Sequence, residues 1–451
     1  MRKGYLTKED VNKITPQQVH EVLGRTMQIE GFPIVADLKR SHGMYLYDAR
    51  YDKYYLDFFS FFASWALGHN HPKMEDPEFV EKIAFIARHK PSNSDIYTVE
   101  MAQFVATFER VAMPAEFSHL FFISGGALAV ENALKTAFDW KVRKNIAAGK
   151  GEKGYKVIYF REAFHGRTGY TVSMTNTFDP NKTKFFPKFD WYRINNPKIT
   201  FPLNEENLRK VEEAEKSAIE QIESILSRDA DDIAAIIIKP IQGEGGDNHF
   251  RGEFFKGLRE LADKYDVMLI FDEVQTGVGL TGKFWAYQHF DVIPDIISFG
   301  KKTQVCGIMV TSRVDEVKEN VFNVPSRINS TWGGNLVDMV RSQRILEIIE
   351  EDNLVDNAAK VGEYLLSKLN ELGDDFPKLL SNIRGRGLMC AFDLPDTQLR
   401  DKLRLKAFEK GLIVLPCGEK SIRFRPPLTC TNEEVDKMAA IMYDCLKELE
   451  T

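Results

Sequence analysis

The sequence predicts an α/β protein in which a large domain with a mostly parallel sheet is followed by a smaller α+β domain. Between about residues 95 and 330, short apolar runs such as "IAAIIIKP" and "VMLIFDE" alternate with helical stretches. These runs are continuously apolar, which indicates strands covered by helices on both faces. From residue 336, a long helical stretch leads to three strand-like segments, "GLMCAFDL", "GLIVLP" and "SIRFRP", and a final helix. That order favours a separate α+β unit.

The composition is typical of a globular protein of two or three structural units. The chain has 451 residues, of which 43% are hydrophobic and 28% charged, enough for a large buried core. The net charge of −6 is small for this length and gives no general attraction to nucleic acid or anionic lipid. We therefore expect small-molecule partners, with no nucleic acid and no membrane.

Cysteine usage and the start of the chain favour a cytoplasmic protein. The five cysteines form no C-x-x-C pair, as expected for reduced thiols rather than a disulfide framework or a zinc site. The first residues lack the apolar segment of a secretion signal. His69 and His71 have no carboxylate or cysteine at ligand spacing, so we expect a loop there and no metal site.

Three segments follow from these patterns. Residues 1–70 form an N-terminal segment that belongs to the small domain, residues 71–335 the large domain, and residues 336–451 the C-terminal small domain. A first helix is expected in "ITPQQVHEVL", with Thr15 as the cap and Pro16 at the first helical position. The last helix is expected after the capping box of residues 431–434.

Ligands of such sheets collect at the carboxyl ends of the strands, so the residues after each apolar run are the candidates for the site. Gly125 and Gly126 follow "HLFFIS" and open a helical pattern, an arrangement that suits a phosphate group. Phe164, His165 and Arg167 follow "KVIYF". Arg167 is either a surface residue or a bidentate partner for a carboxylate.

The remaining strands end in charged residues. Glu244 lies in "IQGEGG", and Asp272 ends "VMLIFD". A buried acid needs a cation or hydrogen-bond donors, and the protonated nitrogen of a pyridine ring would serve, although a strand meeting water explains Asp272 equally well. Lys301 and Lys302 follow "DIISFG". They mark either a return to solvent or an amine nucleophile for a carbonyl cofactor such as pyridoxal phosphate.

A glycine pattern in the same region points to a different cofactor. Residues 277–282 match G-x-G-x-x-G, the dinucleotide fingerprint of nicotinamide enzymes. That fingerprint should lead directly from a strand into a helix. Here four residues separate it from the strand, and an aromatic stretch follows. We therefore discount the pattern and keep a nicotinamide-dependent enzyme only as a runner-up.

Taken together, the motifs resemble the class III pyridoxal-phosphate aminotransferases of fold type I. The resemblance spans nearly the whole chain and is carried by "SGGALAVENALK", "FHGRTGY", "PIQGEGG", "FDEVQTGVGLTG", "FGKKTQVCG", "NSTWGGN" and "IRFRPPL". It implies pyridoxal 5'-phosphate as the cofactor and a homodimer. Within the family, the motifs are most similar to enzymes that transfer the terminal 6-amino group of L-lysine to 2-oxoglutarate, giving 2-aminoadipate 6-semialdehyde and L-glutamate.

The resemblance also implies how the cofactor is held. Lys301 would bind it covalently and move the proton between substrate and cofactor, while Asp272 would pair with the pyridine nitrogen. Phe164 and Val274 would contact the ring, and Gln275 would contact the phenolic oxygen. Gly126 and Ala127 would bind the phosphate, and Thr331 would reach the same phosphate from the partner subunit.

For the substrates, the resemblance implies two arginines and a gate. Arg167 would bind the carboxylate remote from the reacting carbon, and Arg423 the α-carboxylate of the keto acid. Glu244 would pair with Arg423 while lysine reacts and then move away, and Asn329 would also contact substrate.

Two departures and several alternatives remain. Family members carry Glu-Pro where this chain has Lys239-Pro240, and Ala-Lys-Gly where it has Gly300-Lys301-Lys302. Ornithine and 4-aminobutyrate are alternative donors, because their aminotransferases share most of the motifs. A non-catalytic homologue that only binds the cofactor is a further alternative. The joint presence of Asp272, Lys301 and both arginines argues against it.

Overall fold

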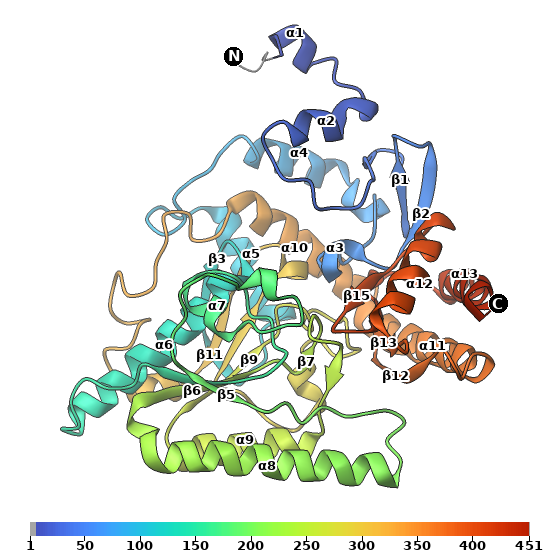
Figure 1. Ribbon diagram of the computed structural model, residues 1–451. Coiled ribbons are helices and arrows are strands. Elements are labelled where there is room, and N and C mark those ends of the chain that lie inside the picture. The colour runs from blue at the N-terminus through green and yellow to red at the C-terminus, as the bar shows by residue number, and fades with distance from the viewer. Residues whose placement is uncertain (1–5, 451) are drawn as a thin grey trace.

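A seven-stranded sheet forms the centre of the computed structural model, which describes residues 6–450 (Figure 1). Its strand order is β3-β11-β10-β9-β6-β4-β5. Strands β10, β9, β6, β4 and β5 run parallel, whereas β11 is antiparallel to both β10 and β3. The bounds are β3 Phe117–Ile123, β4 Lys156–Phe160, β5 Tyr192–Ile194, β6 Ile233–Ile238, β9 Met268–Asp272, β10 Ile296–Phe299 and β11 Cys306–Thr311.

The predicted mostly parallel sheet is thus confirmed, with two further strands, β5 and β11, that had not been predicted. Strand β11 begins only a few residues after β10 ends. Such a short connection cannot contain a crossover helix, so the strand has to turn back antiparallel.

Helices cover both faces of this sheet, which explains why its strands are apolar throughout. All six residues of β6 are buried. Ile236 packs in one hydrophobic cluster with Phe255 of α9, while the adjacent Ile237 packs in another with Leu134 of α6. The helices between residues 77 and 351 are α4 Pro77–Ile86, α5 Val99–Val111, α6 Gly126–Ala147, α7 Gly169–Met174, α8 Glu205–Asp229, α9 Gly252–Lys264 and α10 Leu336–Glu351.

The C-terminal region forms a second layer of structure beside the large sheet (Figure 1). Its four-stranded sheet has the order β12-β13-β16-β15 and is antiparallel throughout. A small sheet, β1-β2-β14, joins the two ends of the chain, because β2 pairs in parallel with β14. The bounds are β1 Tyr45–Asp48, β2 Lys53–Asp57, β12 Ser381–Arg386, β13 Met389–Asp393, β14 Leu412–Ile413, β15 Leu415–Cys417, β16 Ser421–Phe424, α11 Leu354–Asp375, α12 Thr397–Glu409 and α13 Asn432–Glu450.

The long helical stretch expected after residue 336 is broken into two helices. Helix α10 ends at Glu351 and α11 begins at Leu354. Between them Asn353 has a φ of 51°, in the left-handed region that asparagine tolerates better than most residues. The break lets α11 leave the large domain and pack against β12 and α13.

The other elements are short. Thr15 precedes a 3-10 turn at Pro16–Gln18 that runs into α2 Val19–Gly24, close to the expected first helix. Thr431 precedes α13, and its backbone N donates to Glu434 Oε2, which is one of the two hydrogen bonds of the predicted capping box. Its hydroxyl donates to the same oxygen. The remaining α-helices and strands are α1 Lys8–Val11, α3 Ser60–Ala63, β7 Ile241–Gln242 and β8 Asn248–His249.

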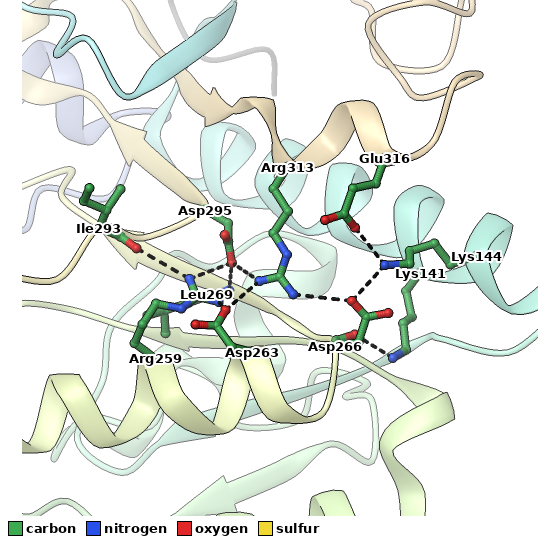
Figure 2. A network of polar contacts seen from close by, with 10 residues as sticks. All are labelled: Lys141, Lys144, Arg259, Asp263, Asp266, Leu269, Ile293, Asp295, Arg313 and Glu316. Carbon is green, nitrogen blue, oxygen red and sulfur yellow. Dashed lines mark hydrogen bonds and ion pairs between the residues drawn. The ribbon is translucent and has the colours of Figure 1, made fainter.

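A network of ion pairs fixes the amino ends of β9 and β10 (Figure 2). Asp295 lies just before β10, and its Oδ2 accepts hydrogen bonds from the Leu269 amide at 2.7 Å, Arg259 at 2.9 Å and Arg313 at 3.0 Å. The three donors satisfy a nearly buried carboxylate. These ion pairs lie at the amino ends of β9 and β10, so they do not occupy the carboxyl ends of the same strands, where ligands of such sheets bind.

Two further features bear on the expected cellular setting. All five cysteines are buried free thiols. Among residues 6–450, the helices are too short or too polar to cross a membrane.

Candidate cofactor and substrate site

A cavity of about 520 Å³ lies at the carboxyl ends of β4, β6, β9 and β10, within the size range of small-molecule sites. All predicted site residues line it except Asn329, Thr331 and Arg423. The full lining is Phe62, Gly126, Ala127, Phe164, His165, Gly166, Arg167, Lys182, Lys239, Gly243, Glu244, Asp272, Val274, Gln275 and Lys301.

Asp272 is the buried anion of this cavity. Its Oδ2 accepts hydrogen bonds from His165 Nδ1 at 2.7 Å and from Lys239 Nζ at 2.6 Å. Its Oδ1 accepts one from the Val274 amide at 3.1 Å. Burial raises the pKa of Asp272, but the Lys239 and His165 contacts outweigh burial and bring it well below its ordinary value. The carboxylate is therefore ionised and available to a cationic ring nitrogen.

The two lysines after β10 have different surroundings. Lys301 lines the cavity, and its Nζ donates to the Phe62 carbonyl at 3.0 Å. Burial, together with the charges of Arg423 and Lys239, lowers the pKa of Lys301 to about 7. Lys302 Nζ is instead buried beneath the site, where it donates to the Gln275 carbonyl at 3.1 Å. A substantial fraction of the Lys301 side chains is therefore deprotonated near pH 7, and the neutral amine is the form that attacks carbonyl groups.

Strained backbone holds Lys301 and its partner in place. Lys301 has a φ of 57°, in the left-handed region. The four residues of α3 also have positive φ, including 52° at Phe61 and 60° at Phe62, so this short turn is left-handed. Such a turn costs roughly 1–2 kcal/mol per residue, and strain of this kind concentrates at functional sites. Phe62 was not predicted as a site residue, because a hydrophobic pattern carries no signal for a left-handed turn.

The start of α6 provides a place for an anion. Gly125 precedes the helix with a φ of 109°, which favours glycine. A Cβ at Gly126 would lie 2.9 Å from Cγ1 of Val274, so only glycine fits between that side chain and the helix start. The first N–H groups of a helix have no intrahelical partner, and here they border the cavity at Gly126 and Ala127.

These features together fit pyridoxal phosphate. The ionised Asp272 matches a protonated ring nitrogen, the Lys301 amine an aldehyde, and the start of α6 a phosphate. Two buried polar atoms of the cavity, Gln275 Oε1 and His165 Nε2, have no hydrogen-bond partner within residues 6–450. Buried polar atoms are rarely left unpaired, so a ligand with polar groups is expected there.

Two arginines near the cavity differ in exposure and in ion pairing. Arg167 is exposed at the rim and makes no ion pair within the described chain. Arg423 is 2% exposed, and its Nη2 donates to Glu244 Oε2 at 2.7 Å. Lys182 pairs with the other oxygen of Glu244. Burial raises the pKa of Glu244, but Arg423 and Lys182 bring it below its ordinary value, so this acid carries a negative charge between two cations. Lys182 ends a short 3-10 helix, Pro180–Lys182, and gave no sequence signal.

Asn329 and Thr331 do not reach the cavity of their own chain. Both are exposed, on the segment between β11 and α10. The Thr331 carbonyl accepts a hydrogen bond from Ser92 Oγ at 2.6 Å, which ties this segment to the loop before α5. Both side chains remain accessible to another molecule.

Comparison with known proteins gives a consistent result over nearly the whole chain. The family model of the class-III aminotransferases matches residues 26–446. The chain is 54% identical over 434 residues to the L-lysine-epsilon aminotransferase of Mycobacterium tuberculosis strain H37Rv, covering 96% of each protein. It is 48% identical over 430 residues to the enzyme of the same name from Streptomyces clavuligerus, covering 95% of this chain and 94% of that one.

A more distant relative and a solved structure are also aminotransferases. The mitochondrial 4-aminobutyrate aminotransferase of Homo sapiens is 32% identical over 467 residues, covering 99% of this chain and 92% of that protein. Among solved structures, the lysine aminotransferase from M. tuberculosis in the internal aldimine form superposes with a TM-score of 0.95 at 54% identity. That match covers 97% of this chain and 100% of the other.

Proposed function

The chain belongs to the class-III aminotransferases, and we propose that it transfers the 6-amino group of L-lysine to 2-oxoglutarate, using pyridoxal 5'-phosphate. The products are 2-aminoadipate 6-semialdehyde and L-glutamate. The identity to two L-lysine-epsilon aminotransferases supports this donor, and the lower identity to a 4-aminobutyrate aminotransferase favours it over that alternative.

The observation that carries the proposal is that the buried Arg423 is paired with Glu244, whereas Arg167 at the cavity rim has no ion pair within residues 6–450. Lysine that reacts through its terminal amine brings one carboxylate, at the end remote from the reacting carbon, and Arg167 can bind it. No carboxylate then reaches Arg423, which would be a buried unpaired charge if Glu244 did not neutralise it. 2-Oxoglutarate has a second carboxylate beside its reacting carbon, which would displace Glu244 from Arg423.

The residues around the cofactor would then divide the chemistry. Bound pyridoxal phosphate supplies an aldehyde that condenses with amines and a ring that accepts electrons. Asp272 would keep the ring nitrogen protonated, and the Gln275 amide would donate to the phenolic oxygen. Phe164 and Val274 would enclose the ring. Lys301, as a neutral amine, would take a proton from the substrate carbon and return it to the cofactor.

We further infer a homodimer in which Thr331 of the partner subunit contacts the phosphate. The exposure of Thr331 and of the 41%-exposed Trp332 beside it supports a contact with another molecule. Asn329 would approach the partner's site from the same segment. The buried free thiols support a cytoplasmic location.

An isotope experiment tests both the donor and the position of transfer. The purified protein, pyridoxal phosphate and 2-oxoglutarate are incubated with L-lysine labelled with nitrogen-15 at either the 6- or the 2-position. L-Glutamate should gain the label from the 6-position alone. Label arriving from the 2-position would contradict the proposal. Faster transfer from ornithine or 4-aminobutyrate than from lysine would reassign the donor.

A further inference from the structure

Lys239 places a second ammonium group in the cofactor cavity. It follows β6 directly, is 9% exposed, and reaches Asp272 Oδ2 with its Nζ at 2.6 Å. The acid expected to serve the cofactor ring therefore already has a cationic partner from the protein.

The hydrogen bonds of Asp272 limit how the ring nitrogen can approach. An ionised carboxylate offers about four acceptor positions. His165 and Lys239 occupy Oδ2, and the Val274 amide occupies one position on Oδ1. One position on Oδ1 is left for a further donor. A ring N–H can be accommodated, but only on a carboxylate that it shares with the Lys239 ammonium.

Sharing has an electrostatic consequence. Two cations on one carboxylate repel each other, so each weakens the binding of the other. Burial removes the water that would screen this repulsion, since Asp272 is 2% exposed. Lys239 also acts on the other side of the cavity, where it is among the charges that lower the pKa of Lys301.

We propose that Lys239 is a positioning residue that holds Asp272 in place before the cofactor binds and then shares its carboxylate with the cofactor ring nitrogen. This inference rests on the proposed placement of the ring nitrogen at Asp272. It predicts that the protonated ring nitrogen adds less to the affinity for the cofactor than it would if Asp272 had no ammonium partner.

The test compares two cofactors on the apoenzyme, prepared from the purified holoenzyme. One is pyridoxal phosphate, and the other is 1-deazapyridoxal phosphate, in which carbon replaces the ring nitrogen. The ratio of their dissociation constants reports the contribution of the ring nitrogen to binding, and Asp272→Asn shows how much of it depends on Asp272. In Lys239→Met the preference for pyridoxal phosphate should rise about tenfold, because the competing cation is gone. Lys239→Arg keeps the charge and should stay close to the wild type.

Thermal unfolding gives an independent readout. Lys239→Met should lower the melting temperature of the apoenzyme more than that of the holoenzyme, because the ring nitrogen replaces the lost ammonium. Lys182→Met is the matched control, since this cavity ammonium pairs with Glu244 instead, and it should leave the cofactor preference unchanged. If Lys239→Met does not fold, Lys239→Gln takes its place.

The outcomes separate this inference from the proposed function. An unchanged preference in Lys239→Met, with equal losses in both melting temperatures, would overturn it and leave a structural role only. Asp272→Asn should abolish the preference in the wild-type background. If it does not, the ring nitrogen does not lie at Asp272, and both the placement and this inference fail.

Discussion

Glu244 holds Arg423 through an Nη2–Oε2 contact of 2.7 Å while its other oxygen is paired with Lys182. The arginine is buried, whereas the acid lies on a loop between β7 and β8. An ion pair between a fixed partner and a loop residue can open without disturbing the core. When Glu244 leaves Arg423, Lys182 remains as its counter-ion.

Replacing Glu244 with alanine should change which amino group the enzyme accepts. Arg423 would then be unpaired and would attract donors that carry a carboxylate beside the reacting amine. We expect the ratio of kcat/KM for L-lysine to that for an α-amino donor such as L-glutamate to fall roughly tenfold, the value of one charge-assisted hydrogen bond. Glu244→Asp is the control. An unchanged ratio in Glu244→Ala would refute the gate.

The fold was largely predictable because its strands carry a strong local signal. Strand β6 is buried on both faces and therefore apolar throughout, a pattern that sequence reveals directly. Strand β11 was missed because its position depends on the short connection after β10. The break at Asn353 was missed because a single left-handed residue does not alter the helical periodicity around it.

The site was predictable to the extent that its residues follow strands. Asp272, Lys301 and Glu244 each follow an apolar run, and the structure brings them to one cavity. Phe62 comes from a left-handed turn and Lys182 from a short 3-10 helix, where residue type alone does not indicate which way the side chain points. The contact between Lys239 and Asp272 joins two strands and depends on their pairing in the sheet.

The two adjacent lysines should differ completely in function. Lys301→Ala removes the amine that lines the cavity, so kcat should fall by at least about 10³-fold, as expected for loss of a nucleophile and proton carrier. Lys302→Met keeps the length of a buried side chain and should retain most activity. Borohydride reduction and peptide mass spectrometry of the wild type should find the cofactor on Lys301. A cofactor attached to Lys302 would reverse the assignment.

The reactivity of Lys301 in the apoenzyme should follow an unusually low pKa. Burial disfavours its ammonium form, and the pKa is lowered to about 7. Acetic anhydride attacks the neutral amine, so acetylation of Lys301 should be half-maximal near pH 7, measured by peptide mass spectrometry with exposed lysines as internal standards. A midpoint above about 9 would show an ordinary, solvated side chain.

The same shift has a consequence for stability with a defined sign. Between pH 7 and the ordinary lysine value, the unfolded chain binds the proton at Lys301 and the folded apoenzyme does not. The contribution of this residue to the free energy of unfolding should therefore rise with pH across that window. Comparison of the apoenzyme with its Lys301→Met variant, by denaturant unfolding at pH 7 and pH 9, isolates it. The free energy of unfolding of Lys301→Met, relative to that of the wild-type apoenzyme, should fall as the pH rises.

Complementation between two inactive variants tests whether Thr331 serves the partner's site. Thr331→Glu should abolish cofactor binding, because it places a negative charge beside the phosphate, and Lys301→Ala removes the amine. A heterodimer of the two, purified through different tags, combines a wild-type Lys301 from one chain with a wild-type Thr331 from the other in one of its two sites. It should therefore show about half of the wild-type activity per dimer, as two-fold symmetry requires. If Thr331 served its own chain, the heterodimer would be as inactive as either parent, because each site would keep one of the two lesions.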